Sequence, residues 1–585
     1  MNRQSRALLT ILIVAAILFP YWLLNRDRTP PPSALLPADT PIPTSGGSAV
    51  ASSRTDPRSF NRLVHSQIAT EIVSMLIQGR LVRIDRVTQE LEPWLAERWE
   101  VSPDQLTFTL TLREGLLWSD GTPFTSADVV FTFDALYDPR TQSQLASALR
   151  PGGQPLRVAA PDPRTVVVTF PSVFAPGIRI LDNLPIFPKH KLEGALAAGE
   201  FGKAWMADTP PSALVSIGPF TLTQYVPAQR MVFDRNPNFW RKDERGVQLP
   251  YLDRLTIELV PDQDAEVVRL QSGQTDFTQQ ALRASDLATL RPLELDGRLQ
   301  VEELGVSPEA DAFVFNLRPE TWAKDPRGAW LNRKEFRQAL SHAVDREAFS
   351  DAVFLGTAVP IHGPITPGNT EWFWPSVPRY EFSPEKAKGL LEGLGLTNRD
   401  QDEWLEDERG NEVRFTALVF RGNTVLERSA TVVREDLRQI GVAVDIVPLE
   451  PNSIYQRMGA GDFDAAFVQF TGNNGDPAGA KDFWLSSGGA HLWNMGQKAP
   501  ATEWERQIDE LMTRQSATLD MAERRRLFND VQRLFAENLP ILYFAAPRVY
   551  IAASARLINL YPARTRPEII WSADTLAIRD GGTSR

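Results

Sequence analysis

The chain has 585 residues, of which 43% are hydrophobic, and it carries a formal net charge of -11 with no cysteine. Its length predicts two or more domains, each able to bury its own core. The absence of cysteine excludes disulfides, thiolate metal sites, thiol nucleophiles and a lipid-modified cysteine. The acidic charge is spread along the chain without a basic block, which argues against a nucleic-acid surface.

The N-terminus begins with an uninterrupted apolar run at residues 7–24, flanked on both sides by arginines. This run is just long enough to cross a bilayer core of roughly 30 Å. It is either a secretory signal peptide or an uncleaved anchor, and the bulky Tyr21 and Trp22, without a small-x-small pair behind the run, favour the anchor. We therefore assign 1–28 as an anchor or signal segment and expect the rest of the chain to be exported.

Residues 29–47 read TPPPSALLPADTPIPTSGG. Their prolines and small polar residues cannot build a core, so we expect an extended, semi-rigid linker and a folded part that starts near Ser48.

The first clear module lies at residues 106–136. Alternating leucine, phenylalanine and threonine over 106–112 predict a strand with one buried and one solvent-facing side. Asp120-Gly121 is a turn pair. Thr125 and Asp128 then form a capping-box pattern before an apolar helix face. This module is structural and carries no chemistry.

Strands and helices alternate through the rest of the chain, which predicts α/β layers in two lobes. Strands are expected at 165–170, 230–234, 255–260, 312–317, 413–420, 443–448 and 465–470. Helices are expected at 264–271, 335–343, 384–394, 424–440, 503–513 and 522–537.

The sequence contains few residues in patterns that are typical of a catalytic site. The five histidines show no spacing of a zinc site, and neither a nucleophile elbow nor a phosphate-binding loop occurs. Asp262 and Asp264 beside Pro261 are explained more simply by capping of a helix than by acid-base chemistry. We therefore expect no enzyme, no catalytic residue, no metal and no cofactor; a hydrolase is the least favoured class because no nucleophile-base pair can be assembled.

Aromatic residues are abundant beside these few reactive groups, with 15 tryptophans. Trp372 and Trp374, in the proline-flanked EWFWP, either line a ligand cleft or pack on their own loop. Large apolar residues with a few directed polar groups are typical of a binding pocket.

Several long motifs in order carry a resemblance to a known family. ELEPWLAERWEVSPDQLTFTLTLREGLLWSDGTPFTSADVVFTF at 90–133 is similar to a segment of the family 5 solute-binding proteins of peptide-type ABC importers. The strand-turn segment at 216–255, FVFNLRP followed by EFRQALSHAVDREAF, and GDFDAAFV at 461–468 resemble later segments of that family.

The resemblance implies a two-lobed periplasmic-binding-protein type II α/β fold with an additional supporting subdomain. We expect lobe 1 to combine 48–80, 210–311 and 545–580, the supporting subdomain to span 81–209, and lobe 2 to span 312–544. The hinge is expected near 312–317 and 543–550. The implied function is that of a monomeric substrate-binding component that delivers a peptide-like solute to an ABC permease and ATPase, in the periplasm or at the outer face of the cytoplasmic membrane.

FTGNNGDP at 470–477 resembles the T-G-D-N-G-D-P loop of the dipeptide-binding subgroup. There, the first aspartate pairs with the ligand's ammonium group, but here that position is Asn473, whose amide supplies no net charge. Asp476 precedes Pro477, which makes turn formation its favoured role. The resemblance also implies main-chain ligand contacts at Gln469 to Thr471, where the ligand would add as a strand.

Arg421 lies near the place where the same subgroup has an arginine that holds the ligand's carboxylate, and a guanidinium suits that task. An ordinary surface arginine is the alternative reading. The predicted ligand-binding residues are therefore Asn473, Thr471, Gln469, Arg421, Asp476 and Trp374. Two further alternatives stay open: the same fold binding a sugar, a metal chelate or another non-peptide solute, and a membrane-anchored sensor.

Overall fold

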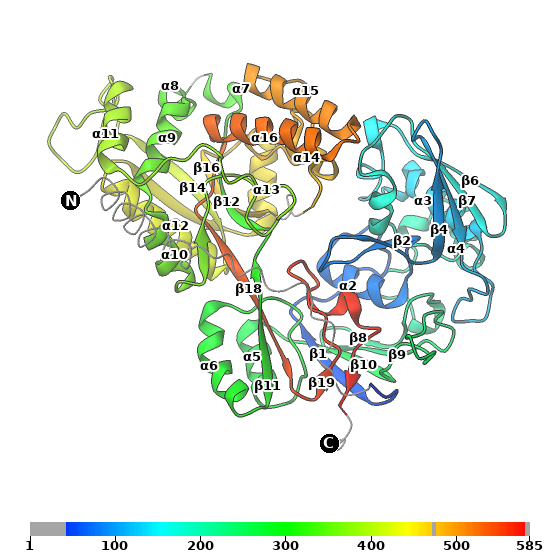
Figure 1. Cartoon of the computed structure of the whole chain (residues 1–585). Coiled ribbons are helices and arrows are strands. Elements are labelled where there is room, and N and C mark those ends of the chain that lie inside the picture. Colours follow the sequence, from blue (N-terminus) through cyan, green and yellow to red (C-terminus); the bar gives the residue numbers. More distant parts are fainter. Residues whose placement is uncertain (1–42, 324, 471–474, 580–585) are drawn as a thin grey trace, which may run out of the picture. The chain divides into compact units, whose positions relative to one another are not determined.

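The computed structural model describes residues 43–323, 325–470 and 475–579 and arranges them as a mixture of helices and sheets (Figure 1). Within these ranges, no helix combines the length and the apolar character that a bilayer span requires. The apolar run at 7–24 lies outside the described residues, so the anchor stays a prediction.

The first sheet has the strand order β1-β10-β9-β8, with β1 and β10 parallel and the other neighbours antiparallel. The predicted strands at 230–234 and 255–260 are confirmed as β9 and β10. The elements of this part are β1 (Ser48–Ser53), α2 (Ile68–Ile77), β8 (Phe220–Val226), β9 (Arg230–Arg235), β10 (Arg254–Leu259), α5 (Gln263–Gln271) and α6 (Ala284–Leu295).

The predicted module at 106–136 is confirmed as β5 (Thr107–Leu112) and α3 (Ser126–Tyr137). Phe108, Leu110 and Leu112 are buried on one side of β5, and Thr125 and Asp128 form the capping box of α3. β5 belongs to an antiparallel sheet of order β4-β5-β7-β6. The other strands of this sheet are β4 (Ala96–Val101), β6 (Arg157–Asp162) and β7 (Thr165–Thr169). The hairpin of β2 (Val82–Ile84) and β3 (Leu91–Pro93) precedes the sheet in the chain, and α4 (Lys189–Ala197) follows it.

The largest sheet of the described chain has the order β15-β14-β16-β12-β17, in which β14 is parallel to both β15 and β16. Apolar strands in a partly parallel sheet need helices on their faces, and the helix-rich segments between the strands supply them. The strands are β12 (Ala310–Phe315), β14 (Arg414–Phe420), β15 (Ala443–Leu449), β16 (Ala465–Phe470) and β17 (Ile541–Leu542).

The helices of this second part agree with the predicted ones to within a few residues at each end. Each of the six predicted helices is present, α5 included. The others are α9 (Lys334–Ala343), α11 (Pro384–Gly393), α12 (Thr424–Arg438), α15 (Glu503–Ala517) and α16 (Met521–Asn538), joined by α7 (Pro319–Trp322), α8 (Gly328–Leu331), α10 (Arg346–Phe354), α13 (Pro451–Ala460) and α14 (Lys481–Trp484).

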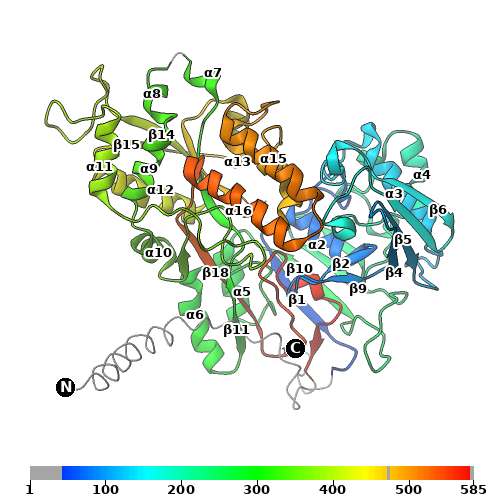
Figure 2. The same ribbon diagram turned by 45° about the horizontal axis from the view of Figure 1, so that its top comes forward.

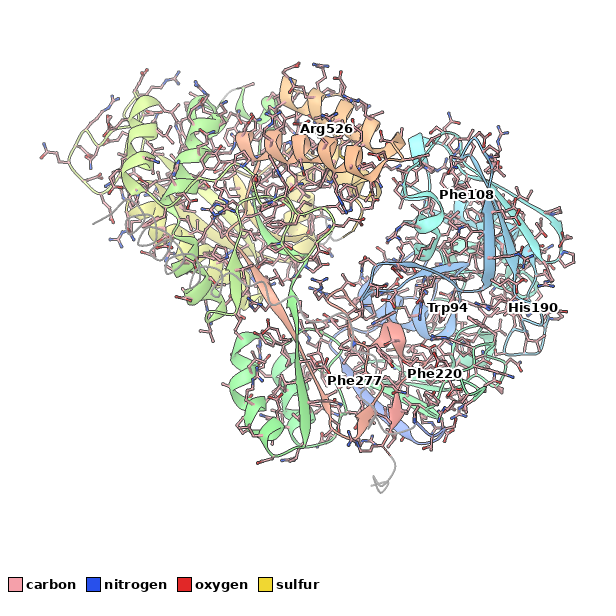
Figure 3. The ribbon with its side chains drawn as sticks, viewed as in Figure 1. Trp94, Phe108, His190, Phe220, Phe277 and Arg526 are labelled. Carbon is pink, nitrogen blue, oxygen red and sulfur yellow. The ribbon has the colours of Figure 1, made fainter. Side chains whose placement is uncertain are left out.

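Two large hydrophobic cores and two small clusters lie within the described chain. The buried residues of the second core all lie between Ala312 and Ala546. The first core runs from Ala49 to Ile257 and adds Phe277 and residues 551–576 from the C-terminal part. Phe220, Phe277 and Phe108, which belong to the first core, and Arg526 on α16 are labelled in Figure 3. The domain boundaries given above stay a prediction; the first core includes residues of both the predicted lobe 1 and the predicted supporting subdomain, and the second core lies apart from it.

The chain passes between the two cores along β11 (Leu299–Val306) and β18 (Ala545–Ser554), which run side by side in Figures 1 and 2. β18 pairs with β11 through Arg548–Ser554 and with β13 (Ala358–Pro360) through Ala545–Pro547. The strand predicted at 312–317 begins two residues earlier, at Ala310, and so the first crossing falls at 307–309. That the crossing segments act as a hinge stays a prediction.

Candidate functional site

The carboxyl ends of parallel strands are the first place to look for a ligand site in such sheets, because loops there leave a crevice beside the strands. In the first sheet, β1 ends at Ser53 and is followed by Arg54. In the large sheet, β14 and β16 end at Phe420 and Phe470. Arg54 and Arg421 directly follow two of these strand ends, and Gln469 lies one residue before the third.

Gln469 lies on the part of β16 that extends beyond β14. β16 pairs with β14 only through Ala465–Phe467, whereas its pairing with β12 continues to Phe470. The stretch 468–470 thus has a strand on one edge only, within the described residues. On that stretch, the Tyr455 hydroxyl donates a hydrogen bond of 3.2 Å to the Gln469 carbonyl. The strand that the sequence predicts at 465–470 is confirmed. At its carboxyl end, the edge that faces β14 has no partner strand among the described residues.

Arg421 follows β14 and is exposed. Its backbone N–H donates to the Leu449 carbonyl at 2.8 Å, and its guanidinium donates to the Pro448 carbonyl at 3.1 Å. Among the described residues, no carboxylate lies within ion-pair distance of it, so most of its five N–H donors stay available. Its role as a carboxylate clamp stays a prediction that this geometry permits.

Asp476 is engaged by the protein itself. It caps the 3-10 turn Pro477–Ala480 by accepting a hydrogen bond of 2.9 Å from the Ala478 N–H. It also lies 2.6 Å from the guanidinium of Arg524, whose side chain is only 4% exposed. The turn that Asp476 predicts is confirmed, and the ion pair with α16 leaves this carboxylate with little capacity for a ligand.

The two tryptophans of EWFWP differ in environment. Trp372 is 2% exposed and packs edge-on against Phe528 at 5.7 Å between ring centroids, within the second core. The Arg524 guanidinium lies 4.9 Å from its ring centroid. Trp374 is partly exposed. Packing therefore explains Trp372, whereas a ligand contact of Trp374 stays a prediction. Thr471 and Asn473 lie outside the described residues.

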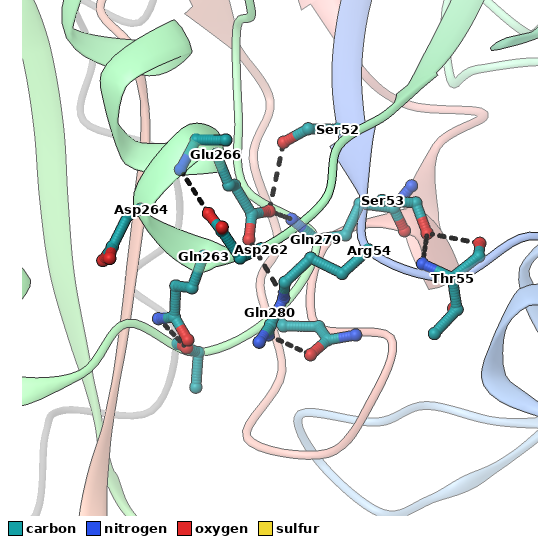
Figure 4. Close-up of polar contacts among 12 residues, drawn as sticks. Ser52, Ser53, Arg54, Thr55, Asp262, Gln263, Asp264, Glu266, Gln279 and Gln280 are labelled. Carbon is teal, nitrogen blue, oxygen red and sulfur yellow. Dashed lines mark hydrogen bonds and ion pairs between the residues drawn. The ribbon is translucent and has the colours of Figure 1, made fainter. Parts of the chain in front are cut away.

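A polar cluster surrounds Arg54 at the carboxyl end of β1 (Figure 4). Arg54 hydrogen-bonds Gln280 and lies 3.4 Å from the carboxylate of Glu266 on α5. The same carboxylate accepts hydrogen bonds from Ser52 Oγ at 3.1 Å and from the Gln279 N–H at 3.3 Å. Burial raises the pKa of Glu266 and lowers that of Arg54, because both charged forms have lost solvent.

Asp262 lies at the edge of this cluster and caps α5 through a hydrogen bond of 2.8 Å from the Ala265 N–H. The capping interpretation of the Asp262 and Asp264 pair is thus confirmed for Asp262. Asp264 instead pairs with Arg283.

Arg566 connects this cluster electrostatically with the crossing segment. Its guanidinium lies 3.8 Å from the Glu309 carboxylate, and its charge acts on Arg54, Asp311 and Glu568. Burial raises the pKa of both Asp311 and Glu568 to about 7, although the Arg566 charge partly opposes it. These carboxyl groups therefore titrate far above the usual range of acidic side chains.

Sequence reasoning missed Arg54, Asp311 and Arg566. Asp311 carried a signal, since it is an acidic residue inside the apolar strand sequence ADAFVF. Arg54 and Arg566 carried none, because nothing local shows that they lie near the crossing segment.

In the described chain, the carboxylates of Asp400, Asp402 and Glu406 lie close enough together to hold a metal ion. Their possible ligand atoms lie within 4.8 Å of one another. Asp400 and Asp402 are exposed. Glu406 accepts a hydrogen bond of 2.7 Å from the Arg399 N–H, and Asp402 one of 2.6 Å from the Trp404 N–H. These hydrogen bonds hold an exposed turn, which accounts for the cluster without an ion.

Comparison with known proteins places this geometry in a family. Residues 90–491 match the model of the bacterial extracellular solute-binding proteins, family 5 Middle. A probable ABC transporter-binding protein of Deinococcus radiodurans is 28% identical over 550 residues, covering 90% of each chain. The dipeptide-binding protein of Escherichia coli is 26% identical over 519 residues, covering 85% of this chain and 89% of that one.

Among solved structures, the periplasmic binding protein MelB of Agrobacterium fabrum, in complex with stachyose, aligns with a TM-score of 0.76. It is 21% identical, and the match covers 93% of this chain and 86% of MelB. The chain has the two-lobed type II fold of periplasmic binding proteins, and this fold and family are those of substrate-binding proteins rather than enzymes. Because the family model spans more than half of its length, the chain belongs to the bacterial extracellular solute-binding proteins of family 5.

Proposed function

We propose that this protein captures a peptide-like solute between its two lobes and delivers it to the permease and ATPase of an ABC importer. The observation that carries the peptide-like class is the one-sided edge of β16, where 468–470 pair with β12 but not with β14. An extended peptide can add to such an edge as a further strand, with main-chain hydrogen bonds that depend little on its sequence. The exposed Arg421 guanidinium suits a terminal carboxylate.

Capture requires that the solute interact better with the closed form than with the open form, because a ligand shifts an equilibrium only by its differential affinity. Protein contacts contribute to the same balance. Lys481 Nζ donates to the Arg150 carbonyl at 2.7 Å, and the Ala175 N–H donates to the Ser516 carbonyl at 2.7 Å. These hydrogen bonds join the predicted supporting subdomain to the predicted lobe 2. For a closed form that is a minor state without solute, solute contacts of a few kcal/mol would suffice to populate it.

A thermal-shift screen of the full-length chain tests the solute class. Dipeptides and tripeptides form one arm, and oligosaccharides and metal chelates form two others. We expect the peptides to raise the melting temperature through mass action on the folded state. Stabilisation by a sugar or a chelate, with none by peptides, would overturn the peptide-like class and leave the solute-binding role intact. Mass spectrometry of material that co-purifies with the protein identifies the natural solute independently.

Residues 7–24 would hold this receptor at the outer face of the cytoplasmic membrane. We expect the full-length chain to fractionate with membranes and a chain without residues 1–28 to be released when it is exported by a cleavable signal peptide. Release of the full-length chain with a processed N-terminus would instead identify the segment as a signal peptide. A receptor that senses the solute without delivering it would still bind the solute. Deletion of its gene would then leave uptake of the solute by the cell unchanged.

A further inference from the structure

Asp311 lies one strand away from the predicted ligand edge of β16. It lies on β12 directly opposite Gln469 of β16 in the antiparallel register. Residues that face each other in such a pair present their side chains to the same side of the sheet. Asp311 is half-buried and Gln469 is exposed. The Asp311 side chain therefore lies on the same face of the sheet as Gln469, one strand away from the unpaired edge of β16, which faces β14.

No hydrogen bond or ion pair joins the Asp311 carboxyl group to another described residue. The charged groups that act on it are Arg566, which favours its ionised form, and Glu309, which disfavours it. Arg566 lies 3.8 Å from the Glu309 carboxylate, so its charge is shared. Burial dominates and raises the pKa of Asp311 to about 7. A half-buried carboxylate without a partner is unfavourable, and a cationic group would relieve that cost.

The acidic residue that follows the carboxyl end of β16 is already engaged, because Asp476 pairs with Arg524 at 2.6 Å. Asn473 stands where the dipeptide-binding subgroup has its ammonium-binding aspartate, and an amide carries no charge. Asp311, on the face that carries Gln469, is a carboxyl group for which the described residues supply no hydrogen-bond or ion-pair partner.

We propose that Asp311 binds a primary ammonium group of the solute, next to Gln469, and so selects solutes that carry a free amine. This inference rests on the proposed function, since it names the group of the solute that the site recognises. A charge-assisted hydrogen bond is stronger than a neutral one, so the amine would contribute substantially to affinity.

Binding of an ammonium group would be linked to the protonation of Asp311. The free carboxyl group is protonated below about pH 7 and must ionise to pair with the cation, so binding would release a proton. Affinity should then rise as pH increases. If the carboxyl group of the complex stays ionised throughout, the affinity at pH 7 exceeds that at pH 5.5 by about sixteenfold.

The test is isothermal titration calorimetry of the full-length chain with two matched pairs of probes. Trialanine is compared with N-acetyl-trialanine, and glucosamine with glucose. Asp311→Asn is the variant, and Glu302→Gln is the matched control: Glu302 lies on the neighbouring crossing strand β11, and burial raises its pKa as well. We expect the amine probes to bind more tightly than their partners, and Asp311→Asn to weaken them by about tenfold to a hundredfold.

The pH readout separates a binding role from a structural one. The increase in affinity between pH 5.5 and pH 7 should disappear in Asp311→Asn and persist in Glu302→Gln. If glucosamine shows this pattern and trialanine does not bind, the inference stands and the peptide-like class fails. If trialanine and its acetylated form bind equally, and Asp311→Asn changes neither, peptide binding stands and the inference is overturned. Failure of both amines to bind also overturns it.

Discussion

Replacement of Arg524 by methionine should destabilise the second lobe substantially. Arg524 lies on α16 with its side chain 4% exposed. Its guanidinium pairs with Asp476 at 2.6 Å, and its Nε–H donates to the Gln515 carbonyl at 3.2 Å. The group also lies 4.9 Å from the ring centroid of Trp372. Methionine keeps much of the side-chain volume and removes every one of these polar contacts.

The magnitude follows from what the substitution leaves behind. Removal of one partner of a buried ion pair costs about 3–5 kcal/mol, because the other charge stays uncompensated. Asp476 is 19% exposed, so water partly solvates its carboxylate after the change. The lower end of that range therefore applies, and we expect a loss of about 3 kcal/mol in the free energy of unfolding.

The assay is urea unfolding of the full-length chain, followed by tryptophan emission, since Trp372 and Trp484 are buried beside α16. Asp476→Asn and the double variant complete a mutant cycle, for which we expect a coupling energy of about 2 kcal/mol. Arg525→Met is the matched control, because Arg525 is the next residue and its side chain is 52% exposed. It should change stability by less than about 0.5 kcal/mol.

Two results would refute this reasoning. One is a loss in Arg524→Met no larger than the loss in Arg525→Met. The other is strict additivity in the cycle, which would mean that the pair contributes nothing beyond its separate members.

Two further substitutions test other parts of the molecule. Glu568 is 2% exposed, and burial raises its pKa from 4.5 to about 7. The folded protein therefore binds this proton more tightly than the unfolded chain, and stability falls as pH rises from about 4.5 to 7, by up to about 3 kcal/mol. Glu568→Gln should raise the melting temperature at pH 8 more than at pH 5, and an equal change at both would contradict the assignment. At the crossing segment, a Cβ on Gly368 would lie 2.3 Å from the Val306 carbonyl oxygen, whereas one on Gly389 of α11 meets no atom within 4 Å. Gly368→Ala should destabilise the protein by more than 1 kcal/mol, and Gly389→Ala should stabilise it slightly because alanine favours helices. Similar melting temperatures for the two variants would show that the backbone near Val306 leaves room for a side chain at Gly368.

Much of the fold could be predicted because its signals are local. The capping box joins Thr125 to Asp128, three residues apart, and the alternation of β5 is complete within one strand. Such features depend on backbone sterics and on neighbours within a turn, which a single segment contains. The boundary at Ala310 was missed, because the start of β12 is set by pairing with Phe470 rather than by its own residues.

The candidate site could be predicted only in part, for the same reason. The strand that contains Gln469 was predicted because it belongs to a recognisable segment, and the turn at Asp476 because Asp-Pro marks a turn; the ligand contacts of both residues stay predictions. The partner of Asp476 was not, since Arg524 lies 48 residues further along. The pairing of Arg54 with Gln280 spans 226 residues. A residue pattern does not encode which distant side chains become neighbours.

The sequence by itself determined the family, the order of the elements and the absence of a recognisable catalytic motif, since each of these rests on short segments of chain. Tertiary structure alone decided which carboxyl groups are engaged and which are left without a partner. Asp476 and Asp311 are both aspartates near β16, yet Asp476 lies against a buried guanidinium, whereas Asp311 faces Gln469 across the sheet without an ion-pair partner among the described residues. Electrostatic environment depends on distance through space and on burial, and the folded chain sets both.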